Sequence, residues 1–392
     1  MAGLYIGNIQ SSATDFGKGS QRDLLDSITM VDAKETPFMA MIPKGSAPTN
    51  ALFEWPVDVA ETPGDNAVYD GTDLADGDYV AGAPTTSYDV MANRVQWYRR
   101  QAKIGKLAQN VQNQAGIKDH YAYSVTKKLL QLKRDAEVRF CSANIRQNTG
   151  DTLYYSAKVA VDAGSGSTTA NKTRGLGEFV NPGASETTHI PASYKTPAAS
   201  YVGGYHNGTA WAGTDTTDAS ALTESQVESV LQSIYEETGK TQTLTLLAGP
   251  NLKKRFKDFT QTQFGSDGTS NVASASAIRS YNADLKDKRI ISTVDVYEGD
   301  FGTLELVPTL WNYFNFADDG TSAFTGSIDT NAAARAKGTG YVIDWDLIEL
   351  RFNQLPQVTE LPDLGGGRRF AVDMIAGLCV KNPLGLGAFF CK

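Results

Sequence analysis

Histidine is scarce in this chain, and the sequence motifs of metal and nucleotide chemistry are missing from it. The three histidines, His120, His189 and His206, form no HxxxH or HExxH spacing, which argues against a His₂ or His₃ metal site. The sequence contains no GxxxxGK(S/T) loop for phosphate binding and no GxSxG nucleophile elbow. We therefore predict no catalytic residue, no metal, no cofactor and no enzymatic activity.

Cysteine is equally rare, and no long hydrophobic run is present. Cys141, Cys379 and Cys391 form neither a CxxC pair nor a zinc-type spacing, which favours folding in a reducing cytoplasm. The first 15 residues lack the basic start and the apolar core of a signal peptide. The most apolar late stretch, Phe370–Phe390, contains charged residues and a proline, so we expect it not to span a bilayer and predict no membrane partner.

The composition is that of a globular protein whose compact elements carry long excursions. Of the 392 residues, 41% are hydrophobic, which suffices for one large core or two smaller ones. Glycine clusters with Ser, Thr, Asn and Asp in long loops, above all from Asn148 to Ala221. The net charge of -8 argues against a protein that coats DNA with its whole surface, but it permits a locally basic inner face.

An extended excursion is predicted between residues 50 and 107. Residues 50–60 alternate apolar and polar side chains like a strand, and Pro56 restricts that strand to an edge or a bulge. A second extended run follows from Tyr88 to Leu107, with Asp-Gly and Pro-Gly turns between the two. Such a two-stranded hairpin is marginally stable alone in water, so it needs a surface on which to lie.

The charges divide this excursion into an acidic part, residues 45–93, called the acidic finger, and a basic part, residues 94–106, called the basic root. No lysine or arginine occurs from Gly45 to Asn93, whereas Arg94, Arg99, Arg100, Lys103 and Lys106 follow directly. The acidic run Asp70, Asp73, Asp76 and Asp78 does not have the spacing of a calcium-binding loop, so we predict no metal there. Two interpretations stay open: a solvated loop, or a finger that contacts another subunit.

The clearest long helix is predicted over residues 117–146. Its apolar residues recur at spacings of three and four and form one stripe: Tyr121, Val125, Leu129, Leu132, Ala136 and Phe140. Basic residues outnumber acidic ones on the remaining surface, which could face nucleic acid or simply water. With the helix included, the subunit-contact hypothesis comprises Glu54, Asp58, Asp70, Asp73, Asp76, Asp78, Arg94, Arg99, Arg100, Lys103, Lys127, Lys128 and Arg134.

Further helices are predicted in the middle of the chain, and strands dominate its end. Thr223 and Gln226 form a capping box before an apolar stripe that Gly239 closes. A short buried strand follows at 244–249, and a second helix follows Pro250. Runs rich in β-branched and aromatic residues predict strands at 289–299, 303–310, 341–352 and 369–380. The expected class is α+β.

Several stretches, in their order along the chain, resemble the major head proteins of tailed bacteriophages with the Hong Kong 97-type fold. They are KETPFMAMIPKG (34–45), FEWPVD (53–58), RGLGEFV (174–180), VYEGDFGTLELVP (296–308), YVIDWDLIELRF (341–352) and GLCVKNPLGLGAF (377–389). The segments 181–218 and 318–340 depart from this pattern and look like insertions.

The resemblance implies a division of the chain into four parts. Residues 1–48 would form an N-terminal arm that reaches across a neighbour, and 49–108 an extended loop. Residues 109–149 with 341–392 would form a peripheral domain around the helix predicted at 117–146, the spine helix of this fold. Residues 150–340 would form an axial domain. No catalytic residues come with this family as a rule.

The implied function is that of a major capsid protein. Hexamers and pentamers would build an icosahedral head shell around the phage double-stranded DNA, through ring-closing contacts between copies. The implied partners are other copies, a portal protein, packaged DNA contacted non-specifically, and possible scaffolding and decoration proteins. The protein would belong to the virion, after assembly in the host cytoplasm. The alternatives are the shell of an encapsulin-type compartment and a phage decoration or tail protein.

Overall fold

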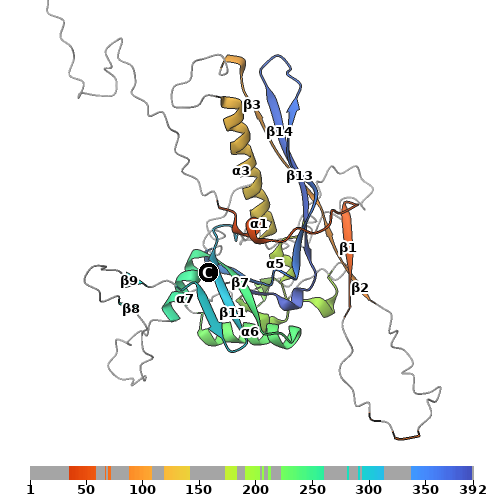
Figure 1. The fold of residues 1–392 in the computed structure, drawn as a ribbon, viewed down its shortest axis with the longest axis vertical. Helices are drawn as coiled ribbons and strands as arrows, with labels where there is room; N and C mark the ends of the chain where they lie inside the picture. Colours follow the sequence, from red (N-terminus) through yellow and green to blue (C-terminus); the bar gives the residue numbers. More distant parts are fainter. Residues whose placement is uncertain are drawn as a thin grey trace, which may run out of the picture.

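A three-stranded antiparallel sheet covered by a long helix forms the upper limb of the molecule (Figure 1). The limb consists of β13 (Ile348–Leu361), β14 (Arg369–Val380) and β3 (Gln96–Lys103), in that order, with helix α3 (His120–Phe140). Tyr98 of β3 packs against Phe140 with 6.0 Å between ring centroids, and Tyr121 packs against Phe370 at 5.1 Å. Aromatic contacts at both ends of α3 therefore hold it along the sheet.

This computed structural model describes only part of the sequence. The described residues are 35–58, 67, 69–71, 88–107, 119–141, 173–182, 190–203, 205–206, 211–212, 222–259, 280–281, 290–291, 294–312 and 337–390. Most of the acidic finger and much of the Gly-rich stretch after Asn148 lie outside these residues.

Helix α3 confirms the prediction of a long amphipathic helix, although it is shorter than the expected 117–146. The Asp119 side chain accepts a hydrogen bond from the Tyr121 backbone N–H and so acts as the N-cap. All six residues of the expected apolar stripe lie in the hydrophobic core or pack against it. The side facing the sheet is therefore the one that the spacing of apolar residues predicts.

The base of the molecule contains a six-stranded mixed sheet that is covered on both faces. Its strands, in order, are β10 (Val296–Gly299), β11 (Gly302–Pro308), β7 (Gln242–Ala248), β12 (Thr339–Ile343), β15 (Gly387–Phe390) and β4 (Tyr201–Gly203). Leu246 and Val342 pack in the cluster under helices α6 (Glu224–Thr238) and α7 (Pro250–Phe259). Leu247 and Tyr341 belong to the core that continues into the limb. Because successive side chains of a strand point to opposite faces, one face of this sheet packs in the core under the helices and the other face packs in the core of the limb.

Helix α6 forms as its sequence predicts. The Thr223 hydroxyl accepts from the Gln226 backbone N–H, and the Gln226 side chain accepts in return from the Thr223 N–H. Gly239 ends the helix with a left-handed φ of 64°. The other short elements are α1 (Pro37–Met41), β1 (Leu52–Val57), β2 (Asp89–Arg94), α5 (Leu176–Phe179), η1 (Ala192–Tyr194), η2 (Ala198–Ser200), β5 (Tyr205–His206), β6 (Trp211–Ala212), β8 (Ser280–Tyr281), β9 (Ile290–Ile291) and η4 (Pro383–Gly385).

Two predicted continuous strands are each divided between two sheets. The run 88–107 breaks at Val95, so that β2 pairs with β1 and β3 joins the limb. The expected excursion is therefore confirmed for β1 and β2, but its continuation to Leu107 is wrong. The run 341–352 divides in the same way, with β12 in the base and β13 in the limb. Tertiary pairing decides both breaks, and the hydrophobic pattern of a single strand does not contain that information.

Residues 35–48, expected in an arm that crosses a neighbour, pack on their own chain. Phe38 of α1 is completely buried, with its ring 6.3 Å from that of Phe140. Further along, the Gly45 N–H donates to Leu350 O of β13 at 3.0 Å. Strands β12 and β15, which the four-part division placed with the spine helix, pair in the base sheet. The division itself stays a prediction.

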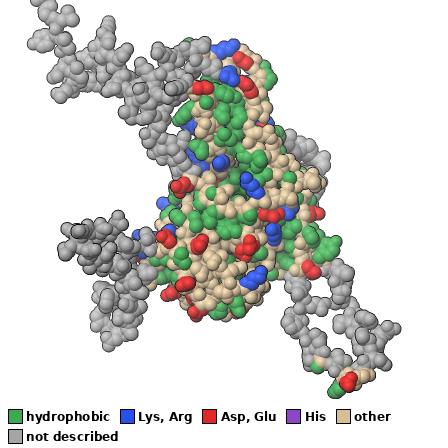
Figure 2. Space-filling model, viewed as in Figure 1, with side chains coloured by type: hydrophobic (Ala, Val, Ile, Leu, Met, Phe, Trp, Pro, Cys, Tyr) green, Lys and Arg blue, Asp and Glu red, His purple; other side chains and the backbone are tan. Residues whose placement is uncertain are grey.

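The limb also exposes apolar side chains. Figure 2 shows hydrophobic residues gathered along the limb, with acidic and basic residues scattered among them. Large exposed apolar residues there include Trp97 of β3, Leu355 of β13 and Leu364 in the turn between β13 and β14. Large exposed apolar patches are typical of protein contact sites.

Candidate subunit-contact surfaces

Strands β1 and β2 form a two-stranded ribbon, which carries the acidic finger and packs against the limb sheet. The base of this ribbon is called the ribbon root. Phe53 and Trp55, which the sequence places on one side of the strand, are both buried and stack at 5.7 Å between ring centroids. Phe53 lies over Gly377 of β14, where an added Cβ would come within 2.6 Å of its ring. Glycine at 377 therefore allows the ribbon to approach the sheet closely.

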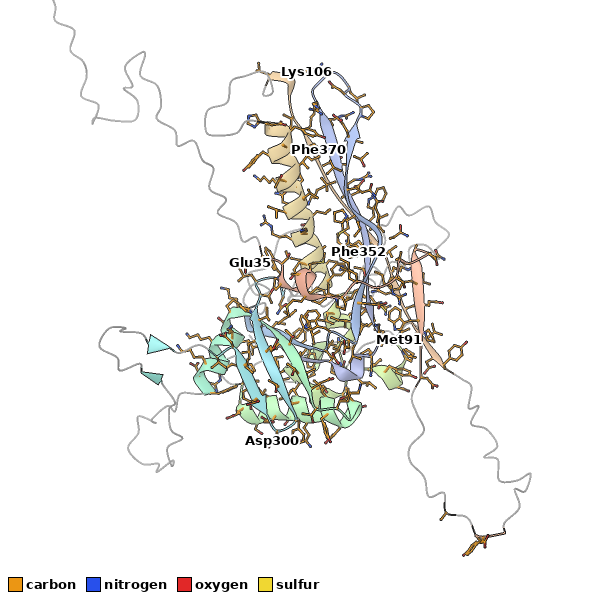
Figure 3. All side chains as sticks on the ribbon, viewed as in Figure 1. Glu35, Met91, Lys106, Asp300, Phe352 and Phe370 are labelled. Carbon is orange, nitrogen blue, oxygen red and sulfur yellow. The ribbon has the colours of Figure 1, made fainter. Side chains whose placement is uncertain are left out.

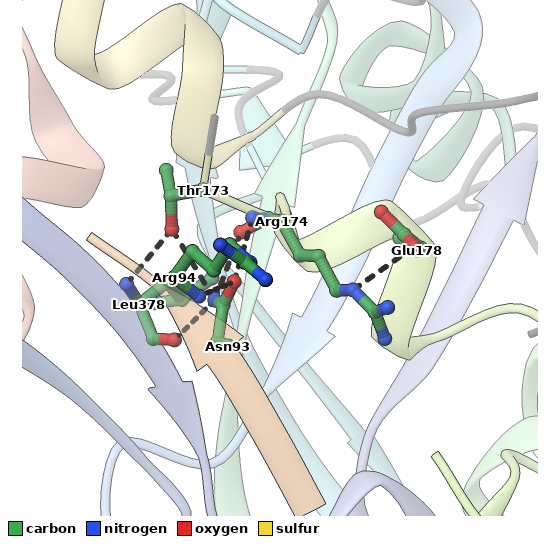
Figure 4. Close-up of polar contacts among 6 residues, drawn as sticks. All are labelled: Asn93, Arg94, Thr173, Arg174, Glu178 and Leu378. Atoms are coloured by element: carbon green, nitrogen blue, oxygen red, sulfur yellow. Dashed lines mark hydrogen bonds and ion pairs between the residues drawn. The ribbon is translucent and has the colours of Figure 1, made fainter. Parts of the chain in front are cut away.

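A buried asparagine joins the ribbon to two other segments (Figure 4). The Asn93 side-chain amide donates to Leu378 O of β14 at 2.6 Å and to Thr173 Oγ1 at 3.2 Å. Its Oδ1 accepts from the backbone N–H groups of Arg174 at 2.9 Å and Arg94 at 2.8 Å. Both ends of a fully buried amide are thus satisfied, which fixes the ribbon root in one position.

An ion pair inside the protein lies next to this amide. Arg174 Nε and Glu178 Oε1 are 3.3 Å apart across one turn that includes α5, and neither side chain is exposed to more than 6%. Burial lowers the pKa of Arg139 on α3, while the charge of Glu178 acts to raise it. Removing either Arg174 or Glu178 would leave the other charge buried without its partner, at a cost of about 3–5 kcal/mol to the stability of the subunit.

The acidic members of the contact hypothesis that the structure describes are all on the surface. Glu54 is exposed on the outer side of β1, and Asp58 is exposed directly after it. Asp70 is exposed at a turn with Gly71, whose φ is 84°. Asp73, Asp76 and Asp78 lie outside the described residues.

Three basic members of the hypothesis are engaged within their own chain. Arg94 is only 8% exposed. Arg99 forms a bidentate ion pair with Asp373 of β14, at 2.7 and 2.8 Å, and hydrogen bonding to Arg99 lowers the pKa of Asp373. Arg100, on the opposite face of β3, pairs with Asp135 of α3 at 2.5 and 2.6 Å. Arg99 and Arg100 therefore tie β3 to the neighbouring strand and to the helix of the limb.

The remaining basic members lie nearer the surface. Lys103 at the end of β3 and Lys127 on α3 are exposed. Lys128 Nζ donates to Gln131 Oε1 at 2.9 Å, and the Arg134 guanidinium lies 6.0 Å from the ring centroid of Trp311. Three of these residues, Lys127, Lys128 and Arg134, lie on one helix, α3.

Glu137 of α3 anchors the start of the described chain, and the sequence gives no local sign of this. Its two carboxylate oxygens accept from the backbone N–H groups of Phe38 at 2.8 Å and Met39 at 2.7 Å. The carboxylate is completely buried, and burial raises the pKa of Glu137 to about 7 against the effect of those two hydrogen bonds. The residues at the start of α1 are therefore fixed to the last turn of α3, where the limb meets the base.

The described residues contain no cluster of three or more His, Cys, Asp or Glu that could hold a metal ion. None of the helices in the described ranges is long and apolar enough to cross a membrane.

Comparisons with solved structures define the class of fold. The chain is similar to the capsid of cyanophage P-SCSP1u, with TM-score 0.50 and 12% identity over 100% of this chain and 99% of that chain. It is also similar to the capsid of a native GTA particle, with TM-score 0.52 and 10% identity over 97% of this chain and 98% of that chain. The protein has the Hong Kong 97-type capsid fold that the motif order implied.

The family follows from the sequence match. Residues 8–390 match the model of the SU10 major capsid protein, and the chain belongs to that family. No curated protein matches it. The protein is therefore a structural protein of a phage capsid shell and a component of the virion, which associates with copies of itself. The role implied by this family is non-enzymatic.

Proposed function

We propose that copies of this chain assemble into hexamers and pentamers, and that these close an icosahedral shell around double-stranded DNA. The observation that carries the proposal is the ribbon of β1 and β2. It is held rigidly at its base by Asn93 and Phe53, and it leads into a segment without any lysine or arginine. A rigid root lets one subunit present the acidic finger to the next in a fixed direction.

The contact is expected to be heterologous, with different surfaces on donor and acceptor, because such contacts close rings around an axis. The finger carries the acidic side chains Glu54, Asp58, Asp70, Asp73, Asp76 and Asp78. The receiving side chains in this proposal are Lys103, Lys127, Lys128 and Arg134. Arg94 is left out because it is buried, and Arg99 and Arg100 because they form ion pairs within their own chain. Each exposed charge pair contributes about 0.2–1 kcal/mol, so repetition around the shell supplies the stability.

The exposed apolar side chains of the limb are proposed to add a second, salt-insensitive part of the contact. Trp97 and Leu355 are each 57% exposed in the single chain. Full burial of a large apolar side chain contributes about 1.5–3 kcal/mol, more than one surface ion pair. Salt should therefore weaken assembly without abolishing it.

The further partners belong to the same proposal. Packaged DNA would meet basic side chains of the inner face non-specifically, and the exposed Lys133 of α3 supports such a contact. A portal protein and possible scaffolding and decoration proteins would complete the head, which would assemble in the host cytoplasm.

The test is deletion of residues 60–88, followed by negative-stain electron microscopy and unfolding of the purified protein. We expect a folded subunit that forms no closed shells, because the root residues of the ribbon stay in place. The matched control changes Lys240, an exposed lysine on the base, to Glu, and this variant should assemble normally. Closed shells of ordinary appearance from the deletion would refute the role of the finger.

A further inference from the structure

A hollow beside the first described residue combines an apolar wall with a row of lysines. Its volume is about 440 Å³, within the range of roughly 300–1,000 Å³ of ligand pockets. Its walls include Val294 and Leu310, and α7 contributes Lys253, Lys254 and Lys257. Leu310 is 54% exposed, so the described chain leaves this apolar wall open.

Lysines give the hollow a basic side. Lys253 Nζ binds Asp295 Oδ1 at 2.9 Å and Leu306 O at 3.3 Å, which fixes its ammonium beside the end of β11. Lys254 and Lys257 follow on the same helix and belong to the same lining. The hollow therefore favours a partner that combines aliphatic side chains with carboxylates.

The chain enters the described body at this hollow. Glu35 forms part of its wall, and Figure 3 shows Glu35 where the limb meets the base, on the opposite side from Met91 of the ribbon. The Glu35 carbonyl accepts a hydrogen bond from Trp311 Nε1 at 2.6 Å, and Glu137 fixes α1 directly after it. The residues that precede Glu35 therefore start from a fixed point at the edge of the hollow.

The preceding sequence has the matching chemistry. Leu24, Leu25, Ile28 and Val31 recur at the spacing of one helix face, and Asp23, Asp26 and Asp32 lie among them. Ile28 stands seven residues before Glu35, a distance of about 10 Å in a helix or about 25 Å when extended. The helical distance brings the aliphatic side chains close to a hollow whose wall includes Glu35, and the extended distance is the upper limit of their reach.

We propose that residues 24–31 of this chain dock in the hollow, with their aliphatic side chains on Val294 and Leu310 and their aspartates facing the lysines of α7. The docked segment becomes part of the subunit, and only the residues before it are available to reach a neighbour. This docking is independent of the role proposed for the acidic finger, so either can fail alone.

Hydrogen exchange in the full-length chain tests whether the segment docks. The variant Leu24→Glu with Ile28→Glu should speed backbone exchange in α7 and in residues 294–310 by about tenfold or more, since 1.4 kcal/mol corresponds to tenfold. The matched control, Leu4→Glu with Ile6→Glu, makes the same change further up the arm and should leave that exchange unaltered. Equal exchange in both variants would overturn the proposal.

A disulfide trap tests which chain supplies the segment. Ile28→Cys is combined with Leu310→Cys in a Cys391→Ser background, in which Cys141 and Cys379 are buried. We expect a disulfide within one chain, identified by peptide mapping of the monomer band on a non-reducing gel. The control pairs Ile6→Cys with Leu310→Cys and should give none. A disulfide between two chains, or no product with Ile28→Cys, overturns docking by the chain's own segment.

Discussion

Replacing Glu137 by glutamine removes a charge that the fold holds in its interior. The Glu137 carboxylate is completely buried and accepts hydrogen bonds from the backbone N–H groups of Phe38 and Met39. Burial raises its pKa from the ordinary 4.5 to about 7, and those two bonds only partly oppose the change. Glutamine has the same shape and one acceptor oxygen, and it does not titrate.

The size and sign of the effect follow from the pKa. A rise from 4.5 to about 7 corresponds to roughly 3 kcal/mol at 1.36 kcal/mol per unit. The native state binds the proton more tightly than the unfolded state, so this stabilising contribution is full below pH 4.5 and is lost as the pH rises to about 7. The free energy of unfolding of Glu137→Gln, relative to that of wild type, should thus rise by about 2–3 kcal/mol as the pH goes from 5 to 8.

Urea unfolding of the unassembled subunit at pH 5, 6, 7 and 8 measures this difference. The matched control is Glu349→Gln. Burial alone would raise the Glu349 pKa, but hydrogen bonds from Arg351 and Lys381 outweigh burial and lower it. The difference in the free energy of unfolding between Glu349→Gln and wild type should therefore be nearly constant from pH 5 to pH 8. A constant difference for Glu137→Gln as well would refute the assignment of a buried, titrating carboxylate.

Two further predictions concern the ribbon root. Asn93→Ala leaves the buried N–H of Arg174 and the carbonyl of Leu378 without their side-chain partner. At about 1–3 kcal/mol for each group, the free energy of unfolding measured in urea should fall by about 3 kcal/mol. A fall of less than about 1 kcal/mol would contradict the hydrogen-bond network around Asn93. Gly377→Val places atoms within 2.6 Å of the Phe53 ring and should cost about 1–3 kcal/mol and prevent shell assembly seen by electron microscopy. The control Gly105→Val, whose Cβ meets no atom within 4 Å, should be tolerated.

The elements that the sequence predicts well are those stabilised by neighbours along the chain. In α6, the capping box at Thr223 and the left-handed Gly239 are local signals, and both ends form as expected. In α3, the spacing of the stripe alone identifies the buried side. The length of α3 is less well predicted, because helical propensity does not fix where a helix frays.

The anchoring residues could not be predicted, because each depends on a partner far along the chain. Glu137 stands among basic residues of a surface helix, and its partners are 98 and 99 residues away. Asn93 is an ordinary polar residue in a strand until β14 and the segment before α5 close around it. Val95 carries no turn signal, although the chain changes sheets there.

The basic root shows why a block of charge in the sequence does not define a surface. Adjacent strand residues point to opposite faces, so Arg99 and Arg100 separate and find Asp373 and Asp135, which are 274 and 35 positions away. Their carboxylates belong to the same limb, and their pairing is complete without a neighbour. The acidic finger differs, because it has no basic residue within its own run from Gly45 to Asn93. This asymmetry assigns the root arginines to the stability of the subunit and leaves the finger as the part whose charge another copy can complement.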